Sequence, residues 1–104
     1  MSNSSNSSVE NEQVSHNVYF DGAVQSLGLA TTAGRATVGV MKKGTYVFSA
    51  SSPEKMVIIS GVLKVKLADS DVQEYIAQEA FDVAAGGSFE VSCDNDVAYL
   101  CYYG

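Results

Sequence analysis

From Val18 onward the chain is divided into nine short runs rich in Val, Ile, Tyr and Phe, and no stretch keeps the apolar period of a helix. Clusters of Gly, Asp, Asn and Ser separate the runs at the spacing typical of β-sandwiches and β-barrels. The sole proline, Pro53, falls between two runs, where its missing N–H costs no strand hydrogen bond. The runs are 23–29, 35–41, 45–50, 55–59, 62–67, 72–76, 80–83, 88–93 and 97–103. The pattern predicts an all-β fold.

The length of 104 residues leaves room for one domain, since domains commonly contain roughly 100–150 residues. Residues 1–17 are mostly Ser and Asn, and they bury too little apolar surface to offset the entropy of ordering. We expect a disordered tail over 1–17 and a barrel over 18–104. The only histidine, His16, falls in this tail and is expected to be solvated there.

The formal charge is −6, and the chain holds only six cations. They form no basic stripe that could follow a phosphate backbone, so we expect no nucleic-acid binding. A phosphate site in such a chain must be built locally from a few donors. No run approaches the roughly 20 apolar residues of a membrane span, and no secretory leader is present. We therefore expect a cytoplasmic protein that does not enter membranes.

Alternation within the runs indicates which side chains share a face. In 62–67, Leu63 and Val65 lie on one face while Lys64 and Lys66 lie on the other, as in a half-buried strand. The run 55–59 is apolar on both faces, so it must be covered on both sides. A chain without helices has only a second copy of itself to provide the outer cover. This predicts a homodimer.

The last two runs flank a turn-prone Asp-Asn-Asp segment at 94–96 and are expected to form a hairpin. Pairing Cys93 with Val97 and Phe89 with Cys101 gives an interior wall. Its predicted members are Phe89, Val91, Cys93, Val97, Tyr99 and Cys101. The two cysteines would lie about 13 Å apart at roughly 3.3 Å per residue, beyond disulfide reach. We expect buried free thiols with a structural role, because no histidine is available to activate them.

Residues 54–61 read EKMVIISG, which matches E-x6-G, the end of the first cupin motif. Counting back from Glu54, the histidine positions of that motif hold Phe48 and Ala50, or Val47 and Ser49. No histidine follows near 86–90 either. Glu54 alone cannot supply the three or four ligands of a metal site, so no metal is expected. The chain thus resembles a single-domain cupin-type jelly-roll β-barrel without the metal ligands.

A longer series of segments is more specific than the E-x6-G pattern as evidence for a family. The segments are YFDG at 19–22, GRATVGVM at 34–41, GTYVF at 44–48, PEKMVIISG at 53–61 and YLC at 99–101. In this order and spacing the chain resembles the bacterial pyrimidine/purine nucleoside phosphorylase family over 18–103. The resemblance implies a small cupin-fold homodimer. It also implies cleavage of purine and pyrimidine nucleosides to free base and ribose 1-phosphate, with inorganic phosphate as co-substrate and no metal or other cofactor.

Two segments depart from the pattern of that family. Where the family commonly shows F-x-V-P-x-H-x-x-F, residues 81–89 read FDVAAGGSF, which replaces the histidine with Gly86. Where the family often ends YLCRY, Tyr102 replaces the arginine. These departures leave open a non-catalytic cupin domain that binds a sugar or nucleoside. A metal-free isomerase or epimerase ranks last, because it would need a histidine base in the barrel.

Phosphorolysis requires groups that hold an anion and groups that face positive charge on the ribose. Arg35 is the only guanidinium, whose planar fork suits phosphate, and the alternative is a surface or dimer-interface arginine. By its parity along the strand, Arg35 shares a face with Thr37 and lies opposite Val38 and Val40. If the two valines face the core, Arg35 is expected to point away from it. Glu54 would bind ribose hydroxyls or oppose ribose charge; alternatively it is a solvated residue at a strand entrance.

Four aromatic residues have the parity of interior positions: Tyr46, Phe48, Phe89 and Tyr99. Such a wall would accept varied bases by stacking, although core packing is the alternative for each residue. Lys55 and Ser60 are candidates for further phosphate contacts. The predicted site therefore consists of Arg35 and Glu54 as catalytic residues, with these aromatic and polar residues binding the substrate.

Overall fold

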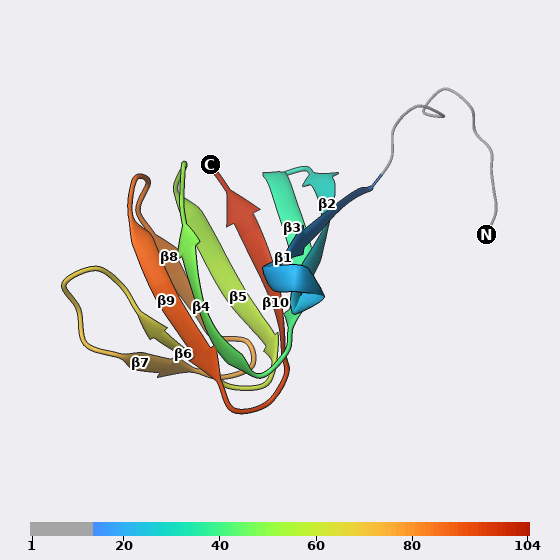
Figure 1. Cartoon of the computed structure of the whole chain (residues 1–104). Coiled ribbons are helices and arrows are strands. Elements are labelled where there is room, and N and C mark those ends of the chain that lie inside the picture. The colour runs from blue at the N-terminus through green and yellow to red at the C-terminus, as the bar shows by residue number, and fades with distance from the viewer. Residues whose placement is uncertain (1–13) are drawn as a thin grey trace, which may run out of the picture.

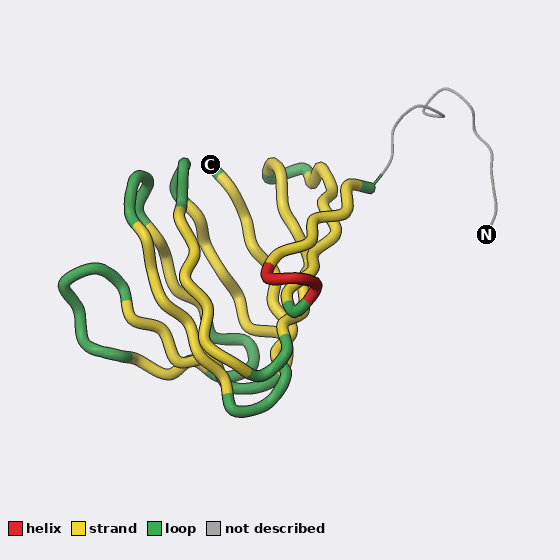
Figure 2. Tube along the Cα trace, in the orientation of Figure 1, coloured by secondary structure: helices red, strands yellow, loops and turns green. Residues whose placement is uncertain are grey.

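The computed structural model describes residues 14–104, which form two antiparallel β-sheets that face each other (Figures 1 and 2). A short 3-10 helix, η2, lies beside the gap between them. The elements in chain order are β1 (Ser15–Tyr19), η2 (Phe20–Gly22), β2 (Val24–Thr31), β3 (Gly34–Met41), β4 (Gly44–Ser49), β5 (Glu54–Ser60), β6 (Leu63–Lys66), β7 (Gln73–Tyr75), β8 (Ala80–Val83), β9 (Ser88–Cys93) and β10 (Val97–Tyr103).

The six-stranded sheet has the order β1-β2-β3-β10-β5-β8, and the four-stranded sheet has the order β4-β9-β6-β7. Consecutive strands repeatedly pass from one sheet to the other, as in a jelly roll. The two sheets share no strand, so in the described part of the chain they form an open barrel rather than a closed one. The predicted all-β jelly-roll class is confirmed, and the closure of the barrel is incomplete.

The nine predicted strands are all present, each within two residues of its expected bounds. One strand, β1, falls partly inside the predicted tail, so the boundary expected at residue 18 moves to Ser15. It pairs with β2 and is mostly exposed, so no apolar alternation marks it in the sequence. His16 lies in this strand, with Nε2 2.9 Å from Oε1 of Gln25. The rest of the predicted tail, residues 1–13, lies outside the described residues.

The predicted hairpin of the last two strands is wrong. β9 pairs with β4 and β6, whereas β10 pairs with β3 and β5, so the turn at 94–96 crosses between the sheets. The predicted inward face is nevertheless correct, because all six wall residues are at most 7% exposed. Alternation fixes which face a side chain takes, but it does not fix which neighbour a strand pairs with.

The core lies between the sheets, and β10, in the middle of the larger sheet, contributes side chains to it. Along β10, Tyr99 and Cys101 point inward, while Leu100 between them faces outward. Both cysteines of the chain are buried free thiols, as predicted. The outward face continues across four paired strands as an apolar row, which we call the outer row: Leu27, Val38, Leu100 and Val57.

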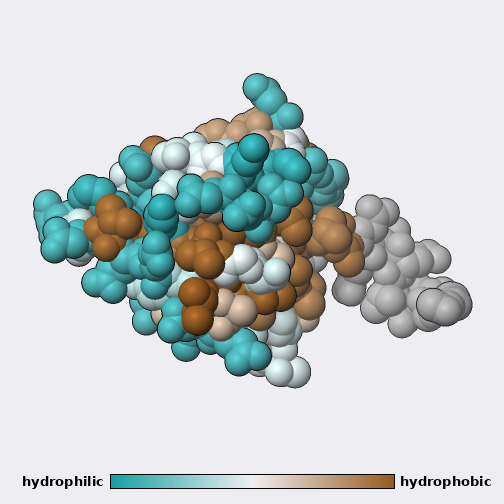
Figure 3. Space-filling view, turned by 90° about the horizontal axis from the view of Figure 1, so that it is seen from below, coloured by the Kyte–Doolittle hydropathy of each residue, from teal (hydrophilic) through white to brown (hydrophobic). Residues whose placement is uncertain are grey.

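Several large apolar side chains are exposed on this single chain, including Val38 at 44% and Ile59 at 47%. Figure 3 shows the lower end of the molecule, where hydrophobic residues extend from the middle toward one side and hydrophilic residues cover most of the other edges. Within residues 14–104, no helix has the length and apolar character needed to cross a membrane.

Candidate functional site

A cavity of about 160 Å³ lies between the two sheets. Both sheets contribute to its wall, and the six-stranded sheet does so in part through its edge strand, β1. The lining residues are Tyr19, Ser26, Met41, Phe48, Ser49, Glu54, Met56, Phe89, Tyr99, Cys101 and Tyr103. Apolar and aromatic side chains make most of this surface, and a few hydroxyls and one carboxyl interrupt it. Such a composition is typical of sites that bind small organic ligands.

The upper end of the cavity, which we call the mouth, is formed by Ser49, Glu54 and Tyr103. Glu54 begins β5 and pairs in register with Tyr103, the last residue of β10, at the end where the C-terminus lies in Figure 1. The thiol of Cys101 donates a hydrogen bond to Oε1 of Glu54 over 3.6 Å. The mouth thus carries a half-buried carboxyl group with a donor beneath it.

Burial raises the pKa of Glu54, and the hydrogen bond from Cys101 partly offsets that rise. Burial, together with the nearby carboxylate, also raises the pKa of the Cys101 thiol to about 12. The thiol therefore stays protonated at neutral pH and cannot serve as a nucleophile. Its chemistry is that of a weak donor to Glu54.

Tyr103 is held at the mouth by its hydroxyl, which lies 3.0 Å from Oγ1 of the buried Thr37. Burial raises the pKa of Tyr103 to about 12, so the phenol remains a hydrogen-bond donor at neutral pH. Sequence reasoning missed this residue, although it shares the inward parity of Tyr99 and Cys101 along β10. Extending the parity argument to the end of the strand would have found it.

Aromatic rings form one side of the cavity. The rings of Phe48 and Phe89 have centroids 5.8 Å apart with a tilt of 31° between their planes. Tyr19 and Phe20 approach Phe48 edge to face, with centroid distances of 6.2 and 5.5 Å. Tyr19 was missed from sequence because it lies in β1, next to the predicted tail. The N-terminal strand therefore closes one side of the cavity.

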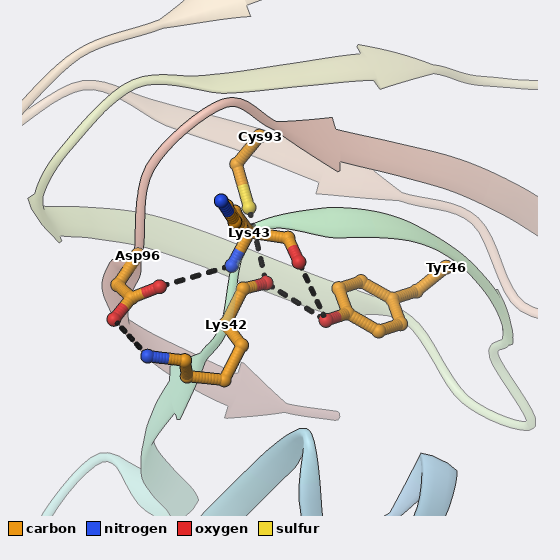
Figure 4. Close-up of polar contacts among 5 residues, drawn as sticks. All are labelled: Lys42, Lys43, Tyr46, Cys93 and Asp96. Atoms are coloured by element: carbon orange, nitrogen blue, oxygen red, sulfur yellow. Dashed lines mark hydrogen bonds and ion pairs between the residues drawn. The ribbon is translucent and has the colours of Figure 1, made fainter.

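Tyr46 is not among the residues that line the cavity, and its hydroxyl points toward Lys42 and Lys43 (Figure 4). Its hydroxyl donates to the backbone oxygen of Lys42 over 2.7 Å. Asp96 accepts hydrogen bonds from Nζ of Lys42 over 2.8 Å and from the backbone N–H of Lys43 over 3.0 Å. These four residues form what we call the clasp, which joins the β3–β4 turn to the β9–β10 turn. The Tyr46 ring is a core residue.

The three remaining predicted residues also lie off the cavity wall. Arg35 is exposed near the upper end of β3. Its parity with Thr37 is as predicted, but the Thr37 face is the core side and the Val38 face is the exposed one, the reverse of the expectation. Lys55 faces a groove outside the mouth that also contacts Glu54 and Tyr103. Ser60 ends β5 at the lower end.

Neither departure from the family pattern lines the cavity. Gly86 lies in the loop between β8 and β9, where its N–H donates to the backbone oxygen of Ala50 over 2.7 Å. Its φ of 85° favours glycine at this turn. Tyr102 faces outward on β10, toward the groove beside Lys55. In the described residues, the structure also brings together no group of three or more His, Cys, Asp or Glu side chains that could hold a metal ion.

Two facing jelly-roll sheets with a carboxyl at the mouth of an aromatic cavity define a small cupin-type domain with a candidate ligand site. The same fold occurs in an RmlC-like cupin from Shewanella frigidimarina NCIMB 400, with a TM-score of 0.66 over 86% of this chain and 81% of that one. The two sequences are 15% identical, so this likeness concerns the fold alone.

A sequence profile described as pyrimidine/purine nucleoside phosphorylase matches residues 14–103. Relatives with that name include one from Vibrio cholerae serotype O1, 43% identical over 86% of this chain and 96% of its own length. Another, from Magnetococcus marinus, is 47% identical over 85% of this chain and 96% of its own. A solved protein of unknown function from Vibrio parahaemolyticus, 38% identical, has a TM-score of 0.85 over 89% of this chain and 100% of that one. The chain belongs to the pyrimidine/purine nucleoside phosphorylase family.

Proposed function

We propose that this chain is a nucleoside phosphorylase that cleaves purine and pyrimidine nucleosides with inorganic phosphate and releases the free base and ribose 1-phosphate. Membership of the family supports the reaction class. The observation that carries the assignment of the site is Glu54, a carboxyl group at the mouth of an aromatic cavity. Its neighbours are a thiol donor and a hydroxyl donor, which suit a group that meets a sugar.

In the reaction, an oxygen of phosphate forms a bond to the anomeric carbon while the bond from that carbon to the base nitrogen breaks. The electron pair of the broken bond moves to the base, which takes up the proton that the phosphate loses on forming the bond. Positive charge develops on the ribose ring in the transition state, and the ionised carboxylate of Glu54 opposes that charge. The donor from Cys101 to Oε1 supports the ionised form of Glu54.

The cavity of about 160 Å³ is close to the size of an engineered cavity of about 150 Å³ that binds benzene. It therefore has room for a six-membered ring of the base, and we place the ribose and phosphate at the mouth. Phe48 and Phe89 provide apolar faces for the base. Lys55 in the outer groove and Arg35 at the same end of the barrel supply the cations for phosphate.

The reaction needs no metal ion in this proposal, because a carboxylate, hydroxyls and cations perform the required roles. Phosphate is the co-substrate and is consumed. After dialysis against a chelator, the rate should therefore equal that of the untreated protein, with no divalent ions added. A loss of activity that zinc, manganese or magnesium restores would contradict this part of the proposal. Since Gly86 lies off the cavity wall, we infer that activity is retained despite its replacement of the family histidine. Tyr102, in contrast, lines the groove that holds Lys55, so it replaces a cation where we place the phosphate.

The protein acts as a cytoplasmic homodimer in this proposal, with the outer row as the contact between subunits. Val38 is 44% exposed in the middle of that row. Val38→Lys should convert the dimer to a monomer in light scattering, because a charge in an apolar contact is costly to desolvate. Val47 is 58% exposed on the other sheet, so Val47→Lys is the matched control and should stay dimeric. A dimer that survives Val38→Lys would remove the outer row as the contact.

The test of the reaction uses the purified protein with uridine or adenosine, with and without phosphate, and follows the release of base by chromatography. We expect release only when phosphate is present. Absence of release above the phosphate-free control would overturn the enzyme assignment. In that case, a thermal shift with nucleoside would support the alternative of a non-catalytic binding domain.

A further inference from the structure

Three residues that lie side by side on neighbouring strands form one level of the cavity wall, which we call the hydroxyl row: Ser26, Gly39 and Tyr99. Ser26 on β2 pairs with Gly39 on β3, and Gly39 pairs with Tyr99 on β10. Ser26 and Tyr99 line the cavity, and the glycine between them has no side chain. The level therefore carries two hydroxyl side chains, on the strands that flank Gly39.

The phenol of Tyr99 lies directly over Gly39. A Cβ atom at position 39 would lie 2.5 Å from both Cζ and the hydroxyl oxygen of Tyr99, and 2.8 Å from Cε1. Real Cβ atoms do not approach other atoms so closely, so any side chain here would push the ring away. Glycine at this position is what allows the ring to lean across β3.

The hydroxyl of Tyr99 has no hydrogen-bond partner among residues 14–104, although the side chain is only 7% exposed. The hydroxyls of Tyr46 and Tyr103, by contrast, each have one. A buried hydroxyl without a partner is unusual, because it loses its bonds to water and gains none in return. Since this one lines the cavity, it points to a ligand that supplies the missing bond.

Ser26 has a spare donor at the same level. It is only 4% exposed, and its Oγ accepts a hydrogen bond from Nδ2 of Asn17 over 3.2 Å. That bond uses a lone pair of the oxygen and leaves the hydroxyl proton free to be donated. Burial raises the pKa of Tyr99, so the phenol also keeps its proton at neutral pH.

We propose that the hydroxyls of Tyr99 and Ser26 bind the polar edge of the nucleobase in the cavity, and that Gly39, by letting the Tyr99 ring lean back over β3, is the positioning residue that leaves room for both purines and pyrimidines. The proposal rests on the proposed function. A hydroxyl donates one hydrogen bond and accepts others, and it rotates to suit its partner. It can therefore pair with a keto oxygen, a ring nitrogen or an amino group, which accounts for the acceptance of chemically different bases.

The first test is Tyr99→Phe, which removes only the hydroxyl. We expect the KM values for uridine and adenosine to rise about 3- to 10-fold while kcat changes much less, as for the loss of one neutral hydrogen bond. The melting temperature of the ligand-free variant should be equal to or above that of the wild type, because an unpaired buried hydroxyl has been removed. An unchanged KM for both substrates, or a lower melting temperature, would overturn the assignment of Tyr99.

The second test compares two glycine-to-alanine variants. Gly39→Ala should displace Tyr99 into the cavity and lower the ratio of kcat/KM for adenosine over uridine by about 10-fold, because the larger base needs more room. Gly87→Ala is the matched control, since its Cβ would meet only the backbone oxygen of Ala84 at 3.8 Å. An unchanged ratio in folded Gly39→Ala protein would contradict the role of Gly39. If that variant does not fold, Ser26→Ala tests the row by its own rise in KM, with Asn17→Ala as its control.

Direct binding of free bases separates this proposal from the proposed function. We expect uracil and adenine to raise the melting temperature of the wild type, and this shift to shrink in Tyr99→Phe and Ser26→Ala. If the wild type lacks phosphorolysis but shows these shifts, the enzyme proposal fails, and the proposal that the hydroxyl row binds the base is supported. If the wild type is active and Tyr99→Phe keeps its KM and its shifts, the row proposal fails while the enzyme stands.

Discussion

The two ends of the barrel use the same kinds of polar side chain in different ways. At the lower end, the clasp pairs the Tyr46 hydroxyl with a backbone oxygen and Asp96 with Lys42 and Lys43 (Figure 4). In the cavity, the Tyr99 hydroxyl has no partner in the described chain, and Glu54 receives only a weak thiol donor. The proposed site thus differs from the clasp in the hydrogen-bonding capacity that the fold leaves unused, and not in the types of residue it contains.

The largest expected effect comes from removing the charge at the mouth. Glu54→Gln should lower kcat/KM for uridine phosphorolysis by about 100-fold or more, because the amide cannot oppose positive charge on the ribose. Steady-state kinetics at saturating phosphate measure this loss. Asp96→Asn makes the same chemical change in the clasp and should leave kcat/KM near the wild-type value. Equal effects of the two variants would show that the ends do not differ in function.

The next effect concerns pH. Since ionised Glu54 is the active form in our proposal, kcat/KM should fall about tenfold per pH unit below its pKa, which burial places above the ordinary carboxyl range. Cys101→Ala removes the hydrogen bond that lowers this pKa and should move the acid limb to higher pH. Cys93→Ala, at the lower end, should leave the limb in place. An acid limb at the same pH in Cys101→Ala as in the wild type would show that the thiol does not affect the pKa of Glu54.

The raised pKa of Glu54 also affects stability. A carboxyl whose folded pKa lies above its unfolded value favours folding at low pH, and this contribution is lost as the pH rises through the folded pKa. Glu54→Gln should therefore gain stability relative to the wild type as the pH rises from the ordinary carboxyl range to neutrality. Thermal melts across that range measure the difference, and a constant difference would contradict the assigned pKa direction.

A smaller effect separates the two tyrosines. Tyr46→Phe breaks a hydrogen bond worth about 1 kcal/mol, so the melting temperature should fall by roughly 4–8 °C. KM should stay at the wild-type value. Tyr99→Phe should give the reverse result, with stability kept and KM raised. Calorimetry and kinetics on both variants test the contrast, which fails if the two variants behave alike.

The smallest effect is expected at the ion pair of the clasp, because both side chains are largely exposed. The hydrogen bond from Lys42 lowers the pKa of Asp96. Ionised Asp96 therefore stabilises the fold above its unfolded pKa, and this contribution is lost as the pH falls through its folded pKa. Asp96→Asn should melt slightly below the wild type at neutral pH and low salt, and the difference should vanish in acid. A difference that persists in acid would contradict this origin.

The strands and their inward faces were predictable because alternation of apolar residues is a local signal. The pairing of β9 and β10 was not, because the turn at 94–96 suits a hairpin and a crossing equally well. The site was predictable in part. Glu54, Phe48, Phe89 and Tyr99 are inward residues near the mouth or middle of the cavity. Tyr46 has the same parity, but its position along the barrel axis places it in the clasp, and parity carries no information on that axis.

One signal was absent from the sequence, and another was misleading. β1 is an exposed edge strand whose hydrogen bonds to β2 hold it, so no apolar pattern reveals that Tyr19 reaches the cavity. The exposed face of β3 carries Val38 and Val40, which led to the reversed orientation of Arg35. An apolar face that turns toward solvent in one chain resembles a core face when only the sequence is read.

The alternation along β10 has a consequence for changing this protein. Inward residues such as Tyr99 and Cys101 shape the cavity, while Leu100 belongs to the outer row. Substitutions at the two sets can therefore be selected separately, so the proposed base site can be varied without disturbing the proposed contact between subunits. Insertion or deletion of a single residue would exchange the two sets at once. Libraries built on this strand should vary its residues while keeping its length fixed.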